Sequence, residues 1–303
     1  MPRAMSLLPR PIRSKLARRR LAAARLVACD LDGTLLNGDG MIGVRTARLI
    51  GEIIALGVEF VFITARHHSA ASPFSDELHL DETIISLDGA MTSRPHRGEP
   101  ESTIAMPTPP ALEVAAAALA APDVDAALVL ADRLVVTDAD MLVPRRHIHW
   151  NIDRTPIDAA SLESAVGRSA VLELLASGSF LGVNRLHARV AADPAGLRIH
   201  LYGSESHPDL WYLEVRNENA CKLRALEAYV RRRGIGMREV IAIGDARNDL
   251  EFCEKSGYTV AVKNAVAPLK RMADFVTARD CTDEGIDEFL EHFLEARRAG
   301  VTN

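Results

Sequence analysis

The chain has 303 residues, of which 48% are hydrophobic and 25% charged, and this composition indicates a soluble globular protein of about two domains. It excludes a disordered or collagen-like chain, and no window approaches the roughly 18 uninterrupted apolar residues of a membrane span. The four cysteines lie far apart without CxxC spacing, which favours reduced thiols over a disulfide framework or a zinc site. We therefore expect a cytoplasmic protein.

The net charge of −5 is unevenly distributed along the chain. Residues 1–25 carry eight basic side chains and no acidic one, which leaves 28 basic and 41 acidic residues, a net charge of −13, for the rest. An acidic globule binds nucleic acid poorly, so no nucleic-acid partner is expected. The segment 1–25 is predicted to be a disordered basic arm, with an organelle-type presequence or an anchor to an anionic surface as alternatives.

From residue 26 onward, short apolar strands alternate with amphipathic helices. The predicted strands are 26–29, 58–63, 84–87, 211–215, 240–243, 259–262 and 275–277. The predicted helices are 45–56, 219–230, 248–255 and 283–297. Unbroken apolar strands that alternate with helices are typical of a parallel sheet covered on both faces. The expected fold class is α/β, with a doubly wound parallel sheet formed by residues 26–90 and 208–303.

The middle of the chain, residues 91–207, has an alternation of its own. An alanine-rich helix is predicted at 110–121. The strand candidates are 127–130, 134–137, 171–175 and 197–201. More than 100 residues are enough for a separate hydrophobic core, so the sequence predicts an α/β domain inserted into the first one.

Four polar signals lie where apolar strands end or a helix begins. Asp30-Leu31-Asp32-Gly33-Thr34 follows the first strand, and Thr64 follows the second. Lys222 lies in the first turn of a predicted helix, and Gly244-Asp245-Ala246-Arg247-Asn248-Asp249 follows another strand. Ligands of open parallel sheets bind at the carboxyl ends of the strands, so these side chains are candidates for one site.

The chemistry of this set points to phosphoryl transfer. Four carboxylates at one sheet edge would repel one another unless a cation joined them, and oxygen ligands suit Mg²⁺. A lysine and a hydroxyl add a positive charge and a donor for an anion. One aspartate can serve as a nucleophile that becomes an aspartyl-phosphate, and a second can protonate the leaving oxygen and then activate water.

These motifs resemble those of the haloacid dehalogenase superfamily of phosphotransferases, over about residues 26–290. The resemblance implies that Asp30 is the nucleophile and Asp32 the general acid and base. It also implies that Thr64 and Lys222 bind and neutralise the phosphoryl group during transfer. Dehalogenases lack the second carboxylate, so Asp32 argues for the phosphatases.

The resemblance also implies a metal site and its support. Asp245 would ligate Mg²⁺ together with Asp30 and the backbone carbonyl of Asp32. Asp249 would be a further ligand or a carboxylate behind the ligands, and Asn248 would support the same loop and bind substrate.

The position of the insertion is similar to that of the class IIB, Cof-like branch. Thr64 and Lys222 are 158 positions apart, far more than a connection needs, so the segment 91–207 is expected to be a cap domain. A cap closes over the substrate and excludes water during transfer. Arg66 fits a position that often faces the substrate, and Asn264 would lie near the phosphate or the cap entrance.

Several residues depart from the pattern of the family. Ala65 stands in place of a common glycine, Asp88 in place of an asparagine, and Cys221 in place of a serine or threonine before the lysine. Lys263 replaces a small residue. Asp88 and Lys263 change the charge near the expected entrance and therefore bear on substrate choice.

The resemblance implies a Mg²⁺-dependent phosphatase of small phosphorylated metabolites, such as sugar phosphates or related phosphomonoesters. A phosphomutase of the same superfamily is one alternative, and a non-catalytic sensor of a phosphorylated ligand is another. The neighbouring histidines His67 and His68 are interpreted as a solvated pair on a helix.

Overall fold

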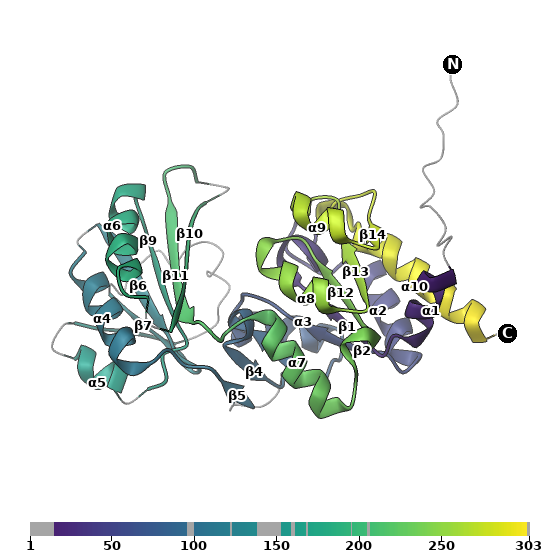
Figure 1. The fold of residues 1–303 in the computed structure, drawn as a ribbon, viewed down its shortest axis with the longest axis horizontal. Coiled ribbons are helices and arrows are strands. Elements are labelled where there is room, and N and C mark those ends of the chain that lie inside the picture. The colour runs from purple at the N-terminus through teal and green to yellow at the C-terminus, as the bar shows by residue number, and fades with distance from the viewer. Residues whose placement is uncertain are drawn as a thin grey trace, which may run out of the picture. The chain divides into compact units, whose positions relative to one another are not determined.

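The computed structural model describes residues 15–95, 100–121, 123–137, 153–158, 161–167, 169–194, 196–204 and 207–301 (Figure 1). The described chain forms two compact units. The first unit contains the described parts of Met1–Thr64, Phe74–Thr83 and Leu226–Asn303. The second contains those of Ala65–Pro73 and Ile84–Ala225. The sequence predicted that the inserted unit spans residues 91–207. The observed unit begins before residue 91 and ends after residue 207.

The first unit is built on a five-stranded parallel sheet in the order β14-β13-β12-β1-β2. Its strands are β1 (Leu26–Cys29), β2 (Glu59–Phe62), β12 (Val240–Gly244), β13 (Tyr258–Ala261) and β14 (Phe275–Val276). β1 and β12 are buried along their whole length, as expected for strands covered on both faces. This unit confirms the doubly wound α/β architecture.

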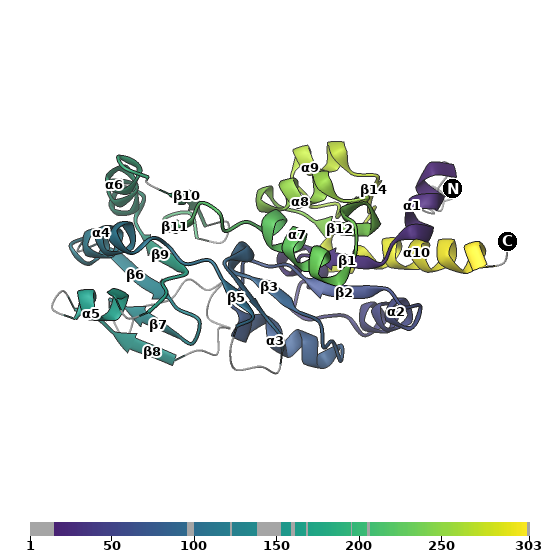
Figure 2. The same cartoon turned by 60° about the horizontal axis from the view of Figure 1, so that its bottom comes forward.

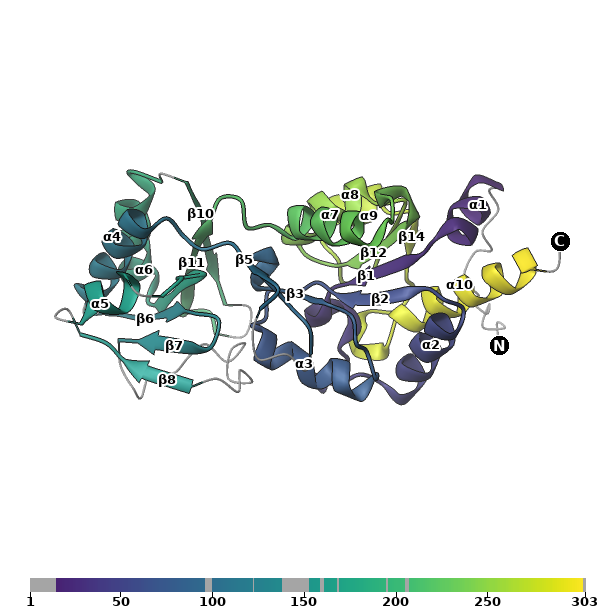
Figure 3. The same cartoon turned by 90° about the horizontal axis from the view of Figure 1, so that it is seen from below.

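Helices cover both faces of this sheet. Those of the first unit are α1 (Lys15–Ala23), α2 (Val44–Ala55), α8 (Leu250–Lys255), α9 (Ala267–Met272) and α10 (Ile286–Val301). α8 and α9 lie on one face and α2 and α10 on the other (Figures 2 and 3). Two more helices, α3 (His68–Glu77) and α7 (Lys222–Arg233), contribute residues to both units. Within the described chain, no helix has the length and the apolar run that a bilayer crossing requires.

The basic segment 1–25 is only in part what the sequence predicted. Residues 1–14 lie outside the described residues, but Lys15–Ala23 forms the helix α1. Its Leu21 is fully buried, and Arg20 forms an ion pair of 3.2 Å with Asp274. The prediction of a disordered arm is wrong for this part, because Leu21 packs into the core of the first unit and Arg20 is paired with Asp274.

The second unit contains a six-stranded sheet in the order β10-β11-β9-β6-β7-β8. Its strands are β6 (Val124–Val129), β7 (Arg133–Val136), β8 (Asp153–Pro156), β9 (Glu173–Gly178), β10 (Leu197–Gly203) and β11 (Trp211–Asn217). Neighbouring strands are antiparallel except for the parallel pair of β7 and β8. The helices are α4 (Thr108–Leu119), α5 (Leu162–Gly167) and α6 (Phe180–Ala191).

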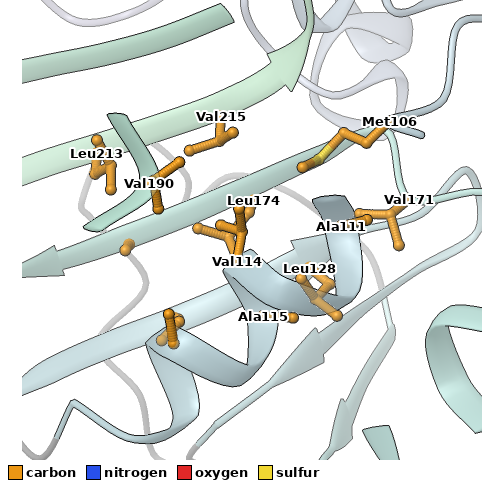
Figure 4. Packing of buried hydrophobic residues seen from close by; sticks show 14 of the residues in the cluster. Met106, Ala111, Val114, Ala115, Leu128, Val171, Leu174, Val190, Leu213 and Val215 are labelled. Atoms are coloured by element: carbon orange, nitrogen blue, oxygen red, sulfur yellow. The ribbon is translucent and has the colours of Figure 1, made fainter. Parts of the chain in front are cut away.

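A hydrophobic core lies between the helices and this sheet. Figure 4 shows Val114 and Ala115 of α4 beside Leu128 of β6 and Leu174 of β9, all of them at most 5% exposed. The alanines of α4 allow its backbone to approach the strands closely. The second unit therefore has a core of its own, as its length suggested.

Two strands pair differently from what the sequence indicated. The strand expected at 211–215 is β11, which lies between β9 and β10 of the second unit and not in the parallel sheet. The strand expected at 84–87 is β3 (Ile84–Ser86), in a small antiparallel sheet with β4 (Met91–Ser93) and β5 (Ser102–Thr103). An apolar run predicts a buried strand, but it carries no information about the partner of that strand.

Candidate active site

The turn after β1 places the first two aspartates differently. Asp30 continues the strand, since its amide donates to the carbonyl of Ile243 at 3.0 Å, and only 6% of the residue is exposed. The chain then turns through Leu31–Leu35, where the amide of Leu36 donates to the carbonyl of Leu31 at 3.0 Å. Asp32 lies in this turn and is exposed.

Gly33 lets this turn approach the loop after β12. Its φ of +78° lies in the left-handed region, and a Cβ at this position would be 2.5 Å from Oδ2 of Asp245. The next residue, Thr34, is fully buried and donates its hydroxyl hydrogen bond to Oδ1 of Asp245 at 2.9 Å. The carboxylate of Asp245 is therefore held directly against the turn that follows Asp30.

Asp249 holds the loop after β12. Oδ2 of this fully buried carboxylate accepts hydrogen bonds from the amides of Asp245 and Ala246, both at 2.9 Å. A Cβ on Gly244 would be 2.6 Å from the same oxygen, so the glycine makes room for the carboxylate. Asn248 lies between the two aspartates and is half-buried.

Three of the predicted metal ligands meet at the carboxyl ends of β1 and β12. Asp30, Asp245 and Asp249 each offer a carboxylate oxygen, and these oxygens lie within 4.8 Å of one another. An oxygen-only donor set with several negative charges fits a hard divalent cation such as Mg²⁺. The cluster does not include the side chain of Asp32, for which the sequence predicted ligation through the backbone carbonyl.

Asn264 connects two loops of the first unit, although its side chain is exposed. Its Nδ2 donates to the carbonyl of Gly33 at 2.7 Å, and its Oδ1 accepts from the amide of Cys281 at 3.0 Å. The nitrogen and the oxygen of the Asn264 side chain thus each bind a backbone group of a different loop. This geometry favours a positioning role over direct substrate binding. Thr64 follows β2 at the same edge of the sheet and is 1% exposed.

Lys222 and Arg66 belong to the second unit. Lys222 is the first residue of α7, is 2% exposed, and its Nζ lies 3.9 Å from Oδ1 of Asp88. Arg66 is half-buried, and its carbonyl accepts a hydrogen bond from the amide of Leu87 at 3.0 Å.

Sequence reasoning missed a buried charged network beside Lys222. Arg216 of β11, 3% exposed, contacts Asp88 at 2.8 Å, Glu214 at 3.3 Å and Glu173 at 3.4 Å. Burial is the main cause that raises the pKa of Glu173, to about 8. The available signal was the presence of ionisable residues inside otherwise apolar strands.

The histidine pair also differs from its interpretation as solvated. His67 is 2% exposed, and its Nδ1 lies 3.0 Å from Oγ of Ser69. Burial, and next the neighbouring His68, lower the pKa of His67 to about 4. The imidazole is therefore neutral in the folded protein at neutral pH.

Known proteins resemble this chain over most of its length. It is 25% identical over 285 residues to the 5-amino-6-(5-phospho-D-ribitylamino)uracil phosphatase YitU of Bacillus subtilis, which covers 89% of this chain and 97% of that protein. It is 27% identical over 283 residues to an HMP-PP phosphatase of Serratia proteamaculans, covering 90% and 96%. A phosphoglycolate phosphatase of Methanothermobacter thermautotrophicus is 35% identical over 105 residues, which span 35% of this chain and 47% of that protein.

Solved structures share the fold. A haloacid dehalogenase-like hydrolase from Bacteroides thetaiotaomicron matches with a TM-score of 0.76 and 22% identity, over 88% of this chain and 98% of that one. A sugar phosphatase described as HAD subclass IIB matches with a TM-score of 0.70 and 21% identity, over 89% and 99%. The family model of the haloacid dehalogenase-like hydrolases matches residues 27–290, which include both strand-end aspartate motifs and the inserted unit. The chain therefore belongs to the haloacid dehalogenase-like hydrolases.

Proposed function

We propose that this phosphoric monoester hydrolase cleaves small phosphorylated metabolites with the help of Mg²⁺ and through an aspartyl-phosphate on Asp30. The observation that carries the proposal is the meeting of three carboxylates within 4.8 Å at the ends of β1 and β12. Asp30 is at most slightly exposed, as a nucleophile sheltered from bulk water should be, whereas Asp32 is exposed and can exchange protons with solvent.

Asp30, Asp245 and Asp249 would hold the metal, with the backbone carbonyl of Asp32 as a further oxygen ligand. When bound, Mg²⁺ supplies positive charge that offsets the repulsion between the nucleophile and the anionic phosphoryl group. Thr34 and Asn264 act behind these ligands, because they fix the Asp245 carboxylate and the Gly33 carbonyl.

The reaction divides into two displacements at phosphorus. A carboxylate oxygen of Asp30 attacks the phosphorus, the bond to the leaving oxygen breaks, and Asp32 gives that oxygen its proton. Asp32, now a base, takes a proton from water, the water oxygen attacks the phosphorus, and the bond to Asp30 breaks to release phosphate. The Thr64 hydroxyl donates to the phosphoryl oxygens, and the Lys222 ammonium offsets their charge.

The similar proteins suggest which substrates to try. Their names refer to 5-amino-6-(5-phospho-D-ribitylamino)uracil, HMP-PP, phosphoglycolate and pyridoxal phosphate. These compounds share a phosphoryl group on a small metabolite but differ widely in the leaving group. A panel of them, extended by sugar phosphates, covers the substrate class that we propose.

Phosphate release by the purified chain tests the proposal. We expect release from at least one member of the panel in the presence of Mg²⁺, and its loss after chelation and in Asp30→Asn. Asp39→Asn is the matched control, since Asp39 is an exposed aspartate of the same segment and should not matter. If Asp30→Asn still releases phosphate at the wild-type rate, the reaction does not pass through an aspartyl-phosphate on Asp30.

The alternatives predict different products. A phosphomutase would move the phosphoryl group to another hydroxyl of the substrate without net release of phosphate. A sensor would bind the phosphorylated ligand without turnover. Product analysis by ³¹P NMR on the same panel separates these two outcomes from hydrolysis.

A further inference from the structure

The turn Leu87–Gly89 of the second unit has an unusual backbone. Leu87, Asp88 and Gly89 have φ values of +48°, +50° and +95°, so three consecutive residues lie in the left-handed region. Leucine in particular rarely adopts this conformation. The turn is also buried, with Leu87 at 0% and Asp88 at 5% exposure. Strained and buried backbone of this kind is concentrated at functional sites, so the residues that this turn contacts are candidates for a functional role.

The turn packs against the start of α7, where Lys222 lies. A Cβ on Gly89 would be 2.5 Å from the carbonyl oxygen of Cys221, the residue before the lysine. Oδ1 of Asp88 lies 3.9 Å from Nζ of Lys222. The same turn therefore contacts the backbone that precedes Lys222 and pairs with the charged end of its side chain.

The second oxygen of the Asp88 carboxylate binds a different cation. Oδ2 lies 2.8 Å from Nη2 of Arg216, which projects from β11 and is 3% exposed. Glu214 and Glu173 contact the same guanidinium at 3.3 and 3.4 Å. Arg216 is thus held by three carboxylates, whereas Asp88 divides its charge between Arg216 and Lys222.

We propose that Asp88 is a positioning residue for Lys222, and that Arg216 balances the Asp88 carboxylate so that the lysine ammonium stays fixed without losing its charge to an ion pair. This inference rests on the proposed function, in which Lys222 binds the phosphoryl group. It adds Asp88 and Arg216 to the residues on which phosphate binding depends.

Removing Arg216 and removing the charge of Asp88 would affect Lys222 in opposite ways. Without Arg216, the full charge of Asp88 acts on Lys222 and competes with phosphate for the ammonium. Without the charge of Asp88, the guanidinium and the ammonium lose the negative charge that they share, and their mutual repulsion displaces the lysine. Each single change therefore weakens phosphate binding. Removing both charges together restores the charge balance beside Lys222, although Glu214 and Glu173 then lose Arg216 as their partner.

A double-mutant cycle tests this coupling. The substrate is the one that the wild-type chain hydrolyses best, and KM, kcat and the inhibition constant of inorganic phosphate are measured for Asp88→Asn, Arg216→Met and the double variant. We expect each single variant to raise KM and the inhibition constant by about tenfold, and the double variant to return to within about threefold of the wild type. Asparagine tolerates the left-handed conformation of residue 88, so the turn persists in the first variant.

Glu214→Gln is the matched control. This variant also removes one negative charge from the network, but Glu214 pairs with Arg216 and not with Lys222 in the contacts described above. The inhibition constant of phosphate should therefore remain unchanged. Losses that simply add in the double variant, or an equal effect of Glu214→Gln and Asp88→Asn, would show a structural role only. If thermal unfolding shows that Arg216→Met is not folded, the comparison of Asp88→Asn with Glu214→Gln decides. A wild-type chain that releases no phosphate would instead contradict the proposed function.

Discussion

At Gly33, a single hydrogen atom in place of a side chain allows the turn after β1 to meet the carboxylate of Asp245. We expect Gly33→Ala to abolish Mg²⁺-dependent phosphate release, because its Cβ would lie 2.5 Å from Oδ2 of Asp245 and force that carboxylate away. Gly40→Ala is the control, since Gly40 also has a positive φ, of +73°, but nothing lies within 4 Å of the added Cβ. It should lose about 1–2 kcal/mol of stability and keep its activity.

Asp249 combines two roles that substitutions can separate. Asp249→Ala removes the acceptor of two buried amide hydrogen bonds, and should lower the free energy of unfolding by about 1–3 kcal/mol. In Asp249→Asn, the side-chain carbonyl can still accept both bonds, so stability should remain near that of the wild type while half-maximal activity needs more Mg²⁺. Urea denaturation and a Mg²⁺ titration measure the two effects. An unchanged Mg²⁺ requirement in Asp249→Asn would argue against a part in metal binding.

The sequence predicted the meeting of Asp30 and Asp245 because both follow apolar strands of a parallel sheet, whose carboxyl ends share an edge. It could not predict the pairing of Asp88 with Arg216. These residues lie on a turn and on a strand of the second unit, and their contact depends on strand order, which periodicity does not encode. The hydrogen bonds of Asn264 to two backbone groups depend in the same way on how loops approach each other.

At the scale of an element, α1 shows how burial of a few side chains fixes a basic segment. Leu21 is fully buried, whereas Leu16 of the same helix is 60% exposed. Leu21→Ala should therefore lower the free energy of unfolding by about 2–5 kcal/mol, and Leu16→Ala by about 0.5 kcal/mol or less. Chemical denaturation of both variants checks this difference. Equal stabilities would mean that α1 does not contribute to the fold of the first unit.

Strand partners are the part of the fold that local sequence leaves open. The helices at 45–56 and 283–297 were predicted close to α2 and α10, since a 3.6-residue apolar period identifies a helix by itself. β11 was predicted as a strand but assigned to the wrong sheet. Its apolar pattern is the same whether its neighbours are parallel or antiparallel, and only the remote residues of β9 and β10 decide.

At the scale of the whole molecule, buried His67 links stability to pH. Burial lowers the pKa of its imidazole to about 4, whereas in the unfolded chain it takes up a proton near pH 6.5. Between these values the unfolded chain binds a proton that the folded chain does not, so stability falls as pH drops from 6.5 to 4, by up to about 3 kcal/mol. His67→Gln should lose less stability than the wild type over this range, measured as Tm at several pH values. His200→Gln, at an exposed position, should behave like the wild type.

The pairing of β1 with β12 has a consequence for how the chain is made. Leu26 pairs with Val240, so the ribosome must add more than 200 residues before β1 can acquire this neighbour. The whole second unit, Ile84–Ala225 included, is synthesised in that interval and can fold first. During this time one edge of β1 has no β12 to bind, and an apolar strand with an open edge can pair with other nascent chains. The yield of active protein therefore depends on translation speed and chaperone access while residues 60 to 240 are being synthesised. This dependence is weaker in a chain whose neighbouring strands are also consecutive in sequence.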